Sequence, residues 1–165
     1  MKLRKLTELA MLTALALIIF VIELHFPDIA IPGVKLGLAN IITVYAVFKY
    51  KPSETAMLVA CRVILGAMFT GNMSALIYSA SGALMCLLGM LYLKRFLNLN
   101  YIWLCSILGG MLHNIGQILS AVAVMQTTAV ISYLPILILS GSVAGLFTGL
   151  CAQAVLKRFR KTEYP

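Results

Sequence analysis

The chain alternates between long apolar stretches and short polar segments over its whole length. Stretches of this kind are typical of transmembrane α-helices, since about 20 residues cross the hydrocarbon core of a bilayer. The second stretch is short, and the fifth is long enough to tilt within the membrane. We predict six spans, at about 7–24, 36–48, 54–70, 74–93, 101–125 and 132–156.

The segments between these spans are too short to fold as extramembrane domains. The sequence therefore predicts one transmembrane domain over residues 1–165, an all-α bundle of six helices. Lys51-Pro52-Ser53-Glu54 is predicted to close the first hairpin, with Ser53 as the N-cap of the third span. Thr70-Gly71-Asn72 predicts a tight turn, with Asn72 as a turn residue.

Composition supports the membrane interpretation. The 165 residues are 62% hydrophobic and only 11% charged, with a mean hydropathy of +1.00, whereas soluble domains are nearer one quarter charged. The four cysteines stand singly in apolar stretches with no Cys-x-x-Cys pair, so they are interpreted as small buried packing residues. They are Cys61, Cys86, Cys105 and Cys151.

The net charge of +8 could suggest a nucleic-acid partner, but the placement of the charges argues against one. Eleven of the thirteen basic residues fall in four clusters about 40–60 residues apart, room for a helical hairpin between each pair. The positive-inside rule then predicts that both termini are cytoplasmic. The clusters are Lys2, Arg4 and Lys5; Lys49 and Lys51; Lys94 and Arg95; and Lys157, Arg158, Arg160 and Lys161.

The stretch Pro32–Asn40 places a lysine, Lys35, at the first turn of the predicted second span. A helix N-terminus already carries partial positive charge, so a lysine there favours the binding of an anion. The preceding segment, Leu24–Lys35, contains two prolines and a glycine and is predicted to be irregular. We therefore expect a site for an anionic small molecule on the outer side, with this loop as a candidate lid.

Arg62 lies about nine residues into the third span, far from either end. Inserting an arginine at that depth costs roughly 2.5–3.5 kcal/mol, so its side chain should face protein or a wet cavity. One interpretation is structural, with Arg62 paired to Glu23 or bonded to helix carbonyls. We favour the other, in which Arg62 contacts an anionic or carbonyl-bearing ligand.

Polar residues recur at helical spacing on the fifth span, where Gly110, His113 or Asn114, and Gln117 share one face. Such residues commonly supply hydrogen bonds between helices in membranes, worth about 0.6–2 kcal/mol each. Contact with a ligand is the alternative, and the sequence does not choose. Asn40, on the second span, has the same two interpretations.

Two stripes of small residues allow close approach of helices, either within the bundle or with another subunit. Ala10 and Ala14 lie four apart on the first span, and Gly141, Gly145 and Gly149 do the same on the last. From spacing alone, packing within the bundle is favoured for both stripes.

Several motifs occur in an order that resembles a known family. The resemblance covers residues 7–125 well and the last span more loosely. The motifs are Pro32–Asn40, Cys61–Gly66, Thr70-Gly71-Asn72, Ser79–Leu84 and His113-Asn114-Ile115-Gly116-Gln117. Together they resemble the membrane family described as heptaprenyl diphosphate synthase component I, or Gx transporter, which is similar to the S-components of energy-coupling factor (ECF) vitamin transporters.

The resemblance implies a vitamin-transporter-like bundle in the bacterial plasma membrane, with an external substrate site capped by the first loop. It implies a membrane coupling subunit and two cytoplasmic ATPases as partners. The family's Ala-x-x-x-Ala docking signature falls on Ala10 and Ala14, which moves these alanines towards an intersubunit role. ATP would be used by the partners, because this chain lacks a Gly-x-x-x-x-Gly-Lys-Ser/Thr phosphate loop, and no cofactor is expected in the chain itself.

The synthase label conflicts with the acidic residues of the chain. Prenyl diphosphate synthases hold diphosphate through magnesium ions on clustered aspartates, because hard cations need several oxygen ligands. This sequence cannot supply such a cluster, so we expect no enzyme activity from it. Its acidic residues are Asp28, Glu8, Glu23, Glu54 and Glu163, which are scattered.

The sequence thus favours a substrate-binding S-component of an ECF-type importer, for a vitamin, a quinone or isoprenoid precursor, or a flavin-like molecule. In this interpretation Lys35 and Arg62 neutralise the ligand, and Asn40, His113, Asn114 and Gln117 orient it. The alternative is a non-catalytic membrane accessory subunit of isoprenoid or quinone biosynthesis. A solitary secondary transporter is a third and weaker reading, because the spans lack the carboxylates that usually relay ions.

Overall fold

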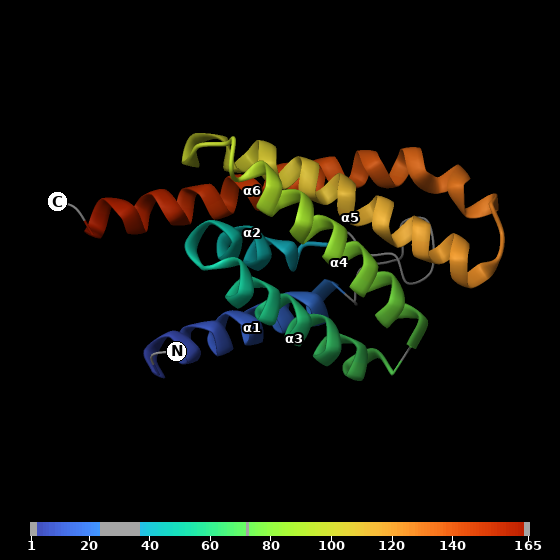
Figure 1. The fold of residues 1–165 in the computed structure, drawn as a ribbon, viewed down its shortest axis with the longest axis horizontal. Helices are drawn as coiled ribbons and strands as arrows, with labels where there is room; N and C mark the ends of the chain where they lie inside the picture. Colours follow the sequence, from blue (N-terminus) through green and yellow to red (C-terminus); the bar gives the residue numbers. More distant parts are fainter. Residues whose placement is uncertain (1–2, 24–36, 72, 164–165) are drawn as a thin grey trace.

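The computed structural model describes residues 3–23, 37–71 and 73–163, and for 73–75 and 160–163 it describes the backbone alone. The described residues form six α-helices and two short 3-10 segments, with no β-strand among them (Figure 1). The α-helices are α1 (Leu3–Glu23), α2 (Asn40–Lys49), α3 (Pro52–Thr70), α4 (Met73–Leu93), α5 (Ile102–Met125) and α6 (Leu134–Glu163). The 3-10 segments, Leu99–Tyr101 and Ala129–Tyr133, lead into α5 and α6.

These helices confirm the predicted helical membrane bundle, with one correction. Five of them are long and apolar enough to cross a bilayer, namely α1, α3, α4, α5 and α6. Helix α2 has only 10 residues and is about 15 Å long, half of the hydrocarbon core. The predicted second span, 36–48, is therefore a half-length helix that begins inside the bundle.

The ends of α3 show why the chain turns where it does. Pro52 occupies the first turn, and the Glu54 carboxylate accepts the backbone N–H of Lys51 at 3.1 Å. Lys51 is the N-cap, so the prediction of Ser53 was wrong: the proline already fits the first helical position. At the other end Gly71 adopts φ = 62°, a left-handed cap that ends the helix as predicted.

Helices α4, α5 and α6 pack at glycines. A Cβ on Gly116 would lie 2.8 Å from the Ser81 carbonyl oxygen of α4, and one on Gly145 would lie 2.6 Å from the Ser106 carbonyl oxygen of α5. Gly141 and Gly149 of α6 are equally tight against α5. The glycine stripe of α6 is thus confirmed as packing within the bundle. In a membrane the hydrophobic effect does not drive helices together, because lipid tails are as apolar as the side chains. The close van der Waals packing at these glycines stabilises the helix pairs instead.

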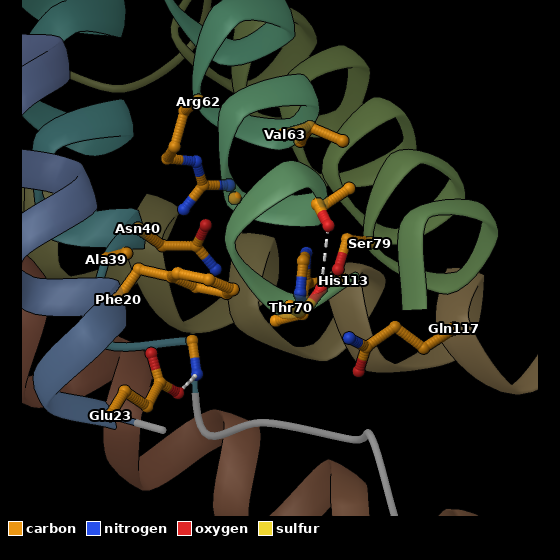
Figure 2. A pocket seen from close by; sticks show the side chains of 13 residues that line it. Phe20, Glu23, Ala39, Asn40, Arg62, Val63, Thr70, Ser79, His113 and Gln117 are labelled. Atoms are coloured by element: carbon orange, nitrogen blue, oxygen red, sulfur yellow. Dashed lines mark hydrogen bonds between the residues drawn. The ribbon is translucent and has the colours of Figure 1, made fainter. Parts of the chain in front are cut away.

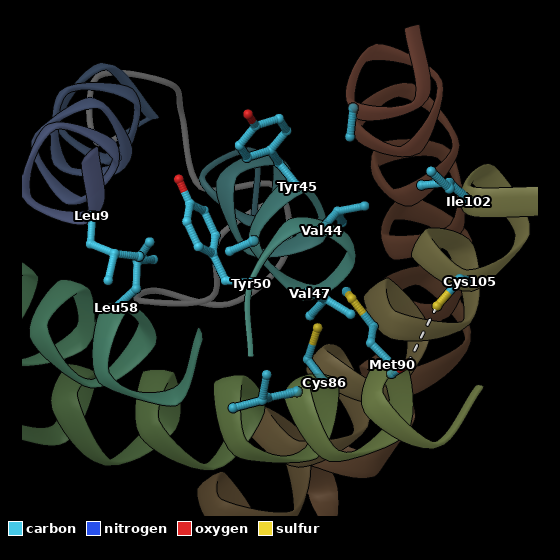
Figure 3. Close-up of a cluster of buried hydrophobic side chains, with 13 residues drawn as sticks. Leu9, Val44, Tyr45, Val47, Tyr50, Leu58, Cys86, Met90, Ile102 and Cys105 are labelled. Atoms are coloured by element: carbon cyan, nitrogen blue, oxygen red, sulfur yellow. Dashed lines mark hydrogen bonds between the residues drawn. The ribbon is translucent and has the colours of Figure 1, made fainter. Parts of the chain in front are cut away.

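The main core lies around α2 (Figure 3). Val44 and Val47 of α2 are fully buried, and they share this cluster with Leu58 of α3 and Met90 of α4. Cys86 and Cys105 belong to the same cluster, as predicted for packing cysteines. Cys61 is instead exposed on α3, and Cys151 is half-buried, because their helical positions turn them partly away from the core.

The described residues of the basic clusters lie at one end of the bundle, where the first turn of α1 and the last turns of α6 are also found (Figure 1). Lys5 pairs with Glu54 at 2.8 Å. The Lys49 ammonium lies over the Phe159 ring of α6 at 5.6 Å, and Lys94 Nζ donates to the Val47 carbonyl at 2.6 Å. This shared end is what the positive-inside prediction requires.

Tyr50 ties the same end together, because its hydroxyl donates to Glu8 Oε2 at 3.0 Å. Burial, together with this carboxylate, raises the pKa of the Tyr50 hydroxyl, so the donor stays protonated. The end of α2 is therefore fixed to α1, while its beginning faces the pocket described next.

Candidate functional site

A pocket lies where α1, α2, α3, α4 and α5 meet, in the half of the bundle away from the basic end (Figures 1 and 2). Its cavity volume is about 40 Å³, room for roughly three water molecules. The wall combines apolar and polar side chains. It is formed by Phe20, Glu23, Gly37, Ala39, Asn40, Arg62, Val63, Gly66, Ala67, Thr70, Ser79, His113 and Gln117.

Arg62 reaches this pocket from the middle of α3 (Figure 2). Its side chain is buried, with 8% exposed, and its Nε has no hydrogen-bond partner. Charge attraction acts between Arg62 and Glu23, but the ion pairs among the described residues do not include these two. The predicted structural pair with Glu23 is therefore absent from the described contacts, and the guanidinium still presents a donor to the cavity.

His113 and Gln117 line the pocket from α5, one helical turn apart. They are 6% and 2% exposed, and His113 Nδ1 and Gln117 Oε1 have no hydrogen-bond partner. Close packing against α4 holds both residues: a Cβ on Gly82 would lie 2.8 Å from the His113 carbonyl oxygen and 2.9 Å from Gln117 Cγ. Glycine at position 82 thus lets α5 bring its polar face up to the cavity.

The beginning of α2 forms the floor between these side chains. Gly37 has φ = 78°, and a Cβ there would lie 2.8 Å from Asn40 Nδ2 and 3.8 Å from His113 Cδ2. Asn40 is buried, with 7% exposed. A smaller hollow of about 10 Å³ shares Gly37, Asn40 and His113 and continues towards Ser106 and Thr148. The left-handed glycine therefore lets the chain turn into α2 without filling the site.

Glu23, the last residue of α1, caps α2. Its Oε1 accepts the backbone N–H of Gly37 in a short hydrogen bond (Figure 2), and the carboxylate also faces the N–H groups of Leu38 and Ala39. No side chain within α2 provides this cap. A carboxylate is the favourable partner for a helix N-terminus, so the positive end of α2 is already occupied by a residue of this chain.

The structure brings together four of the six predicted binding residues, namely Asn40, Arg62, His113 and Gln117. Lys35 lies outside the described residues. Asn114 is buried on another face of α5, where its amide donates to the Leu137 carbonyl of α6. That contact is an interhelical hydrogen bond, one of the two interpretations that the sequence left open for this residue.

The predicted coupling residues, Ala10 and Ala14, are exposed on α1. Neither is therefore packed inside this bundle, so the general preference for internal packing does not hold for this stripe. Large apolar side chains nearby on the same helix, Met11, Leu15 and Ile18, are exposed as well.

Sequence reasoning did not find the contributions of Phe20, Thr70 and Ser79, and it considered Glu23 only as a partner of Arg62. Phe20 and Glu23 are three residues apart at the end of α1, so helical spacing could have grouped them. Thr70 and Ser79 lie in motifs already noted above. Nothing local distinguishes them from helix-capping or packing residues, since Thr70 Oγ1 donates to Ala67 O in its own helix at 3.0 Å.

The arrangement is suited to holding a ligand by hydrogen bonds. It offers a guanidinium, an imidazole and two carboxamides around a small cavity with apolar walls. Among the described residues no group of three or more His, Cys, Asp or Glu side chains could hold a metal ion.

Comparison with protein families identifies one match. The family model for heptaprenyl diphosphate synthase component I matches residues 12–155, which include every described residue of the pocket. No curated protein and no solved structure matches the chain. Because the match spans most of the sequence, including all helices but the first turns of α1 and the end of α6, this chain belongs to the heptaprenyl diphosphate synthase component I family.

Proposed function

We propose that this chain is the substrate-binding membrane subunit, or S-component, of an ECF-type ATP-dependent importer. Its substrate is a small, anionic or carbonyl-bearing and partly hydrophobic molecule. The observation that supports this function is the convergence of three buried, unpartnered polar atoms on one pocket: Arg62 Nε, His113 Nδ1 and Gln117 Oε1.

Unpartnered buried polar groups are costly. Each unsatisfied donor or acceptor costs about 1–3 kcal/mol, and more when the group is charged. Three such atoms around one cavity would cost several kcal/mol of stability, roughly the sum of the three penalties, with no benefit if the side chains served only to pack the helices. A ligand that bonds to them recovers this free energy on binding, which makes the site selective for polar substrates.

In this proposal Arg62 binds the anionic or carbonyl oxygen of the substrate, and Lys35 adds a second positive charge from the loop. Asn40, His113 and Gln117 orient the molecule from α2 and α5. Asn114 belongs to the supporting structure, because its amide is already bonded to α6. The apolar walls, such as Phe20 and Val63, receive the hydrophobic part of the substrate.

The partners in this proposal are a membrane coupling subunit and two cytoplasmic ATPases. The exposed Ala10 and Ala14 suit the approach of a partner helix, since small side chains let helix backbones come close in a membrane. The bundle lies in the bacterial plasma membrane with its basic end in the cytoplasm, where the ATPases act.

The family description favours a second candidate, a non-catalytic membrane accessory subunit of heptaprenyl diphosphate biosynthesis. That role requires a surface that binds a soluble prenyl synthase. The exposed charged groups at the basic end lie in short turns, for example Lys51 and Arg95, or on the terminal turns of α1 and α6, for example Arg4 and Lys157, and none of them belongs to an extramembrane domain among the described residues. The pocket is also left without a purpose in that role, so we place it second.

Co-purification from the native membrane tests the choice. The proposal expects a coupling subunit and ATPases with the tagged chain, and their loss in Ala10→Leu/Ala14→Leu but not in the matched control Met11→Leu/Leu15→Met. Recovery of a prenyl synthase instead, unaffected by the alanine changes, would establish the accessory role.

Native mass spectrometry of the detergent-purified chain tests the site itself. A retained small molecule is expected in the wild type and in Arg95→Ala, which removes an exposed arginine at the basic end. Arg62→Ala should abolish its retention, and Lys35→Ala should weaken it. Full retention in both pocket variants would contradict the proposal.

A further inference from the structure

The hydrogen-bond donors and acceptors of the pocket restrict which ligands it can bind. Arg62 Nε is a donor and requires an acceptor on the ligand. Gln117 presents a carboxamide whose side chain makes no hydrogen bond to a described residue, so it offers one acceptor and two donors whichever way it is turned. The best partner for such an amide is a group that carries an acceptor and an N–H or O–H donor side by side.

The charges around the pocket restrict the ligand further. Among the described lining residues, Arg62 is the one cation and Glu23 the one carboxylate, so together they sum to zero. Two unit charges 4 Å apart interact by about 4 kcal/mol at an effective dielectric constant of 20. Glu23 therefore repels each negative charge of a ligand, against the attraction of Arg62 and, in the proposed function, of Lys35.

Glu23 is fixed in this position by its own structural task. Its carboxylate accepts the N–H of Gly37 and caps α2, so it cannot turn away without freeing the helix N-terminus. The same contact occupies the backbone N–H groups that could otherwise have bound an anion. Glu23 therefore disfavours the binding of a polyanion in two ways. Its carboxylate repels negative charge, and it occupies backbone N–H groups of α2 that a polyanion would need as donors.

From these contacts we infer that the substrate is an uncharged or singly charged molecule that presents a carbonyl acceptor beside an N–H or O–H donor to the cavity of about 40 Å³, with an apolar ring or chain extending from that end. Carboxamides, lactams and hydroxy-carbonyl compounds have this edge. Diphosphates do not, because they carry only acceptors at neutral pH and several charges. This inference rests on the proposed function and names its substrate class; it excludes prenyl diphosphates as the ligand of this pocket.

Three probes with the same ring test the inference: benzamide, benzoate and phenyl phosphate. Their dissociation constants are measured on the detergent-purified full chain by the rise of its melting temperature with probe concentration. Benzamide is expected to bind at least tenfold more tightly than phenyl phosphate, with benzoate between them. Equal or tighter binding of phenyl phosphate would overturn the inference, and so would the absence of binding by all three.

Two variants separate the charge argument from the hydrogen-bond argument. Gln117→Leu should remove the preference for benzamide over benzoate, while the matched control Gln153→Leu, outside the pocket, should keep it. Glu23→Gln retains an acceptor for Gly37 but removes the negative charge, so it should tighten benzoate binding several-fold relative to benzamide. An unchanged ratio in Glu23→Gln would show that the charge of Glu23 does not select the ligand.

The outcomes remain separable from those of the proposed function. If a coupling subunit and ATPases co-purify while phenyl phosphate binds best, the substrate class is wrong and the importer stands. If those partners are absent while benzamide binds best through Gln117, the importer fails and the substrate class stands.

Discussion

Two groups of buried or half-buried polar side chains occupy the same bundle and differ in their partners. At the contacts among α4, α5 and α6, Ser106 bonds to Thr148 at 3.1 Å, Ser81 bonds to Ser120 at 2.7 Å, and Asn114 donates to α6. In the pocket, the polar side chains of α3 and α5 leave Arg62 Nε, His113 Nδ1 and Gln117 Oε1 without partners.

A buried polar side chain inside a membrane bundle therefore does not by itself mark a binding site. Asn114 and His113 are sequence neighbours, both buried, yet one is satisfied by a neighbouring helix and the other faces a cavity. Among the described buried side-chain atoms without a hydrogen-bond partner, Arg62 Nε, His113 Nδ1 and Gln117 Oε1 gather at the pocket, whereas Thr43 Oγ1 and Gln153 Oε1 lie elsewhere. The experiments below test whether this gathering marks a binding site.

The largest effect is expected from Arg62→Met. Replacing a buried, unpaired charge by an apolar side chain of similar length should leave the stability of the ligand-free protein unchanged or raise it. Ligand affinity should fall at least 100-fold, about 2.7 kcal/mol, through the loss of a charge-assisted hydrogen bond. Ligand titration measures the expected loss of affinity, and SDS unfolding measures the stability of the ligand-free protein. A large loss of stability would instead place Arg62 with the structural group.

Gly145→Leu should damage the structural group. Its side chain would meet the Ser106 carbonyl oxygen, which lies 2.6 Å from a Cβ at that position, and separating α5 from α6 should cost about 1–3 kcal/mol or more. SDS unfolding measures this loss. Val143→Leu, on the exposed face of α6, is the control and should be neutral. Equal stability of the two variants would show that α5 and α6 do not need this close approach.

Asn114→Leu and Gln117→Leu form a pair that tests the distinction most directly. Asn114→Leu should reduce the unfolding free energy by about 0.6–1.7 kcal/mol, the range for interhelical hydrogen bonds in membranes, and should leave the probe preference intact. Gln117→Leu should keep or raise the unfolding free energy, since it removes an unsatisfied polar group, and it should abolish the probe preference. If both variants lose stability equally, the division between the groups fails.

The smallest effect is expected from Thr148→Val. The change keeps the shape of the side chain and removes its hydrogen bond to Ser106, so about 0.6 kcal/mol of stability should be lost. Ligand binding should be unaffected, because neither residue lines the main pocket. Thermal unfolding of the variant beside Ser106→Ala measures the shared bond, and additive losses would show that the two hydroxyls act independently.

Much of the fold was predictable because hydropathy is local. The apolar runs placed the five long helices within about four residues of their observed bounds, except that α6 continues to Glu163, seven residues beyond the predicted end. The charge pattern predicted that the basic clusters share one side, and they lie at one end of the bundle. The length of α2 was overestimated, since hydropathy does not show that the chain enters this helix through Gly37 with positive φ. Glycine spacing likewise indicated close packing of α6 but not its partner.

For the site, the sequence was enough to select a few candidate residues. Arg62 was conspicuous because a charge in an apolar span is costly, and His113, Asn114 and Gln117 stood out by helical spacing. Which of them lack partners depends on the three-dimensional packing, because hydrogen bonds between helices join residues far apart in the chain, such as Asn114 and Leu137. The tertiary structure also showed that Glu23 serves the N-terminus of α2, across the segment that contains Lys35. Residue type gives the chemistry that a side chain can perform, whereas packing decides whether a protein group or a ligand completes it.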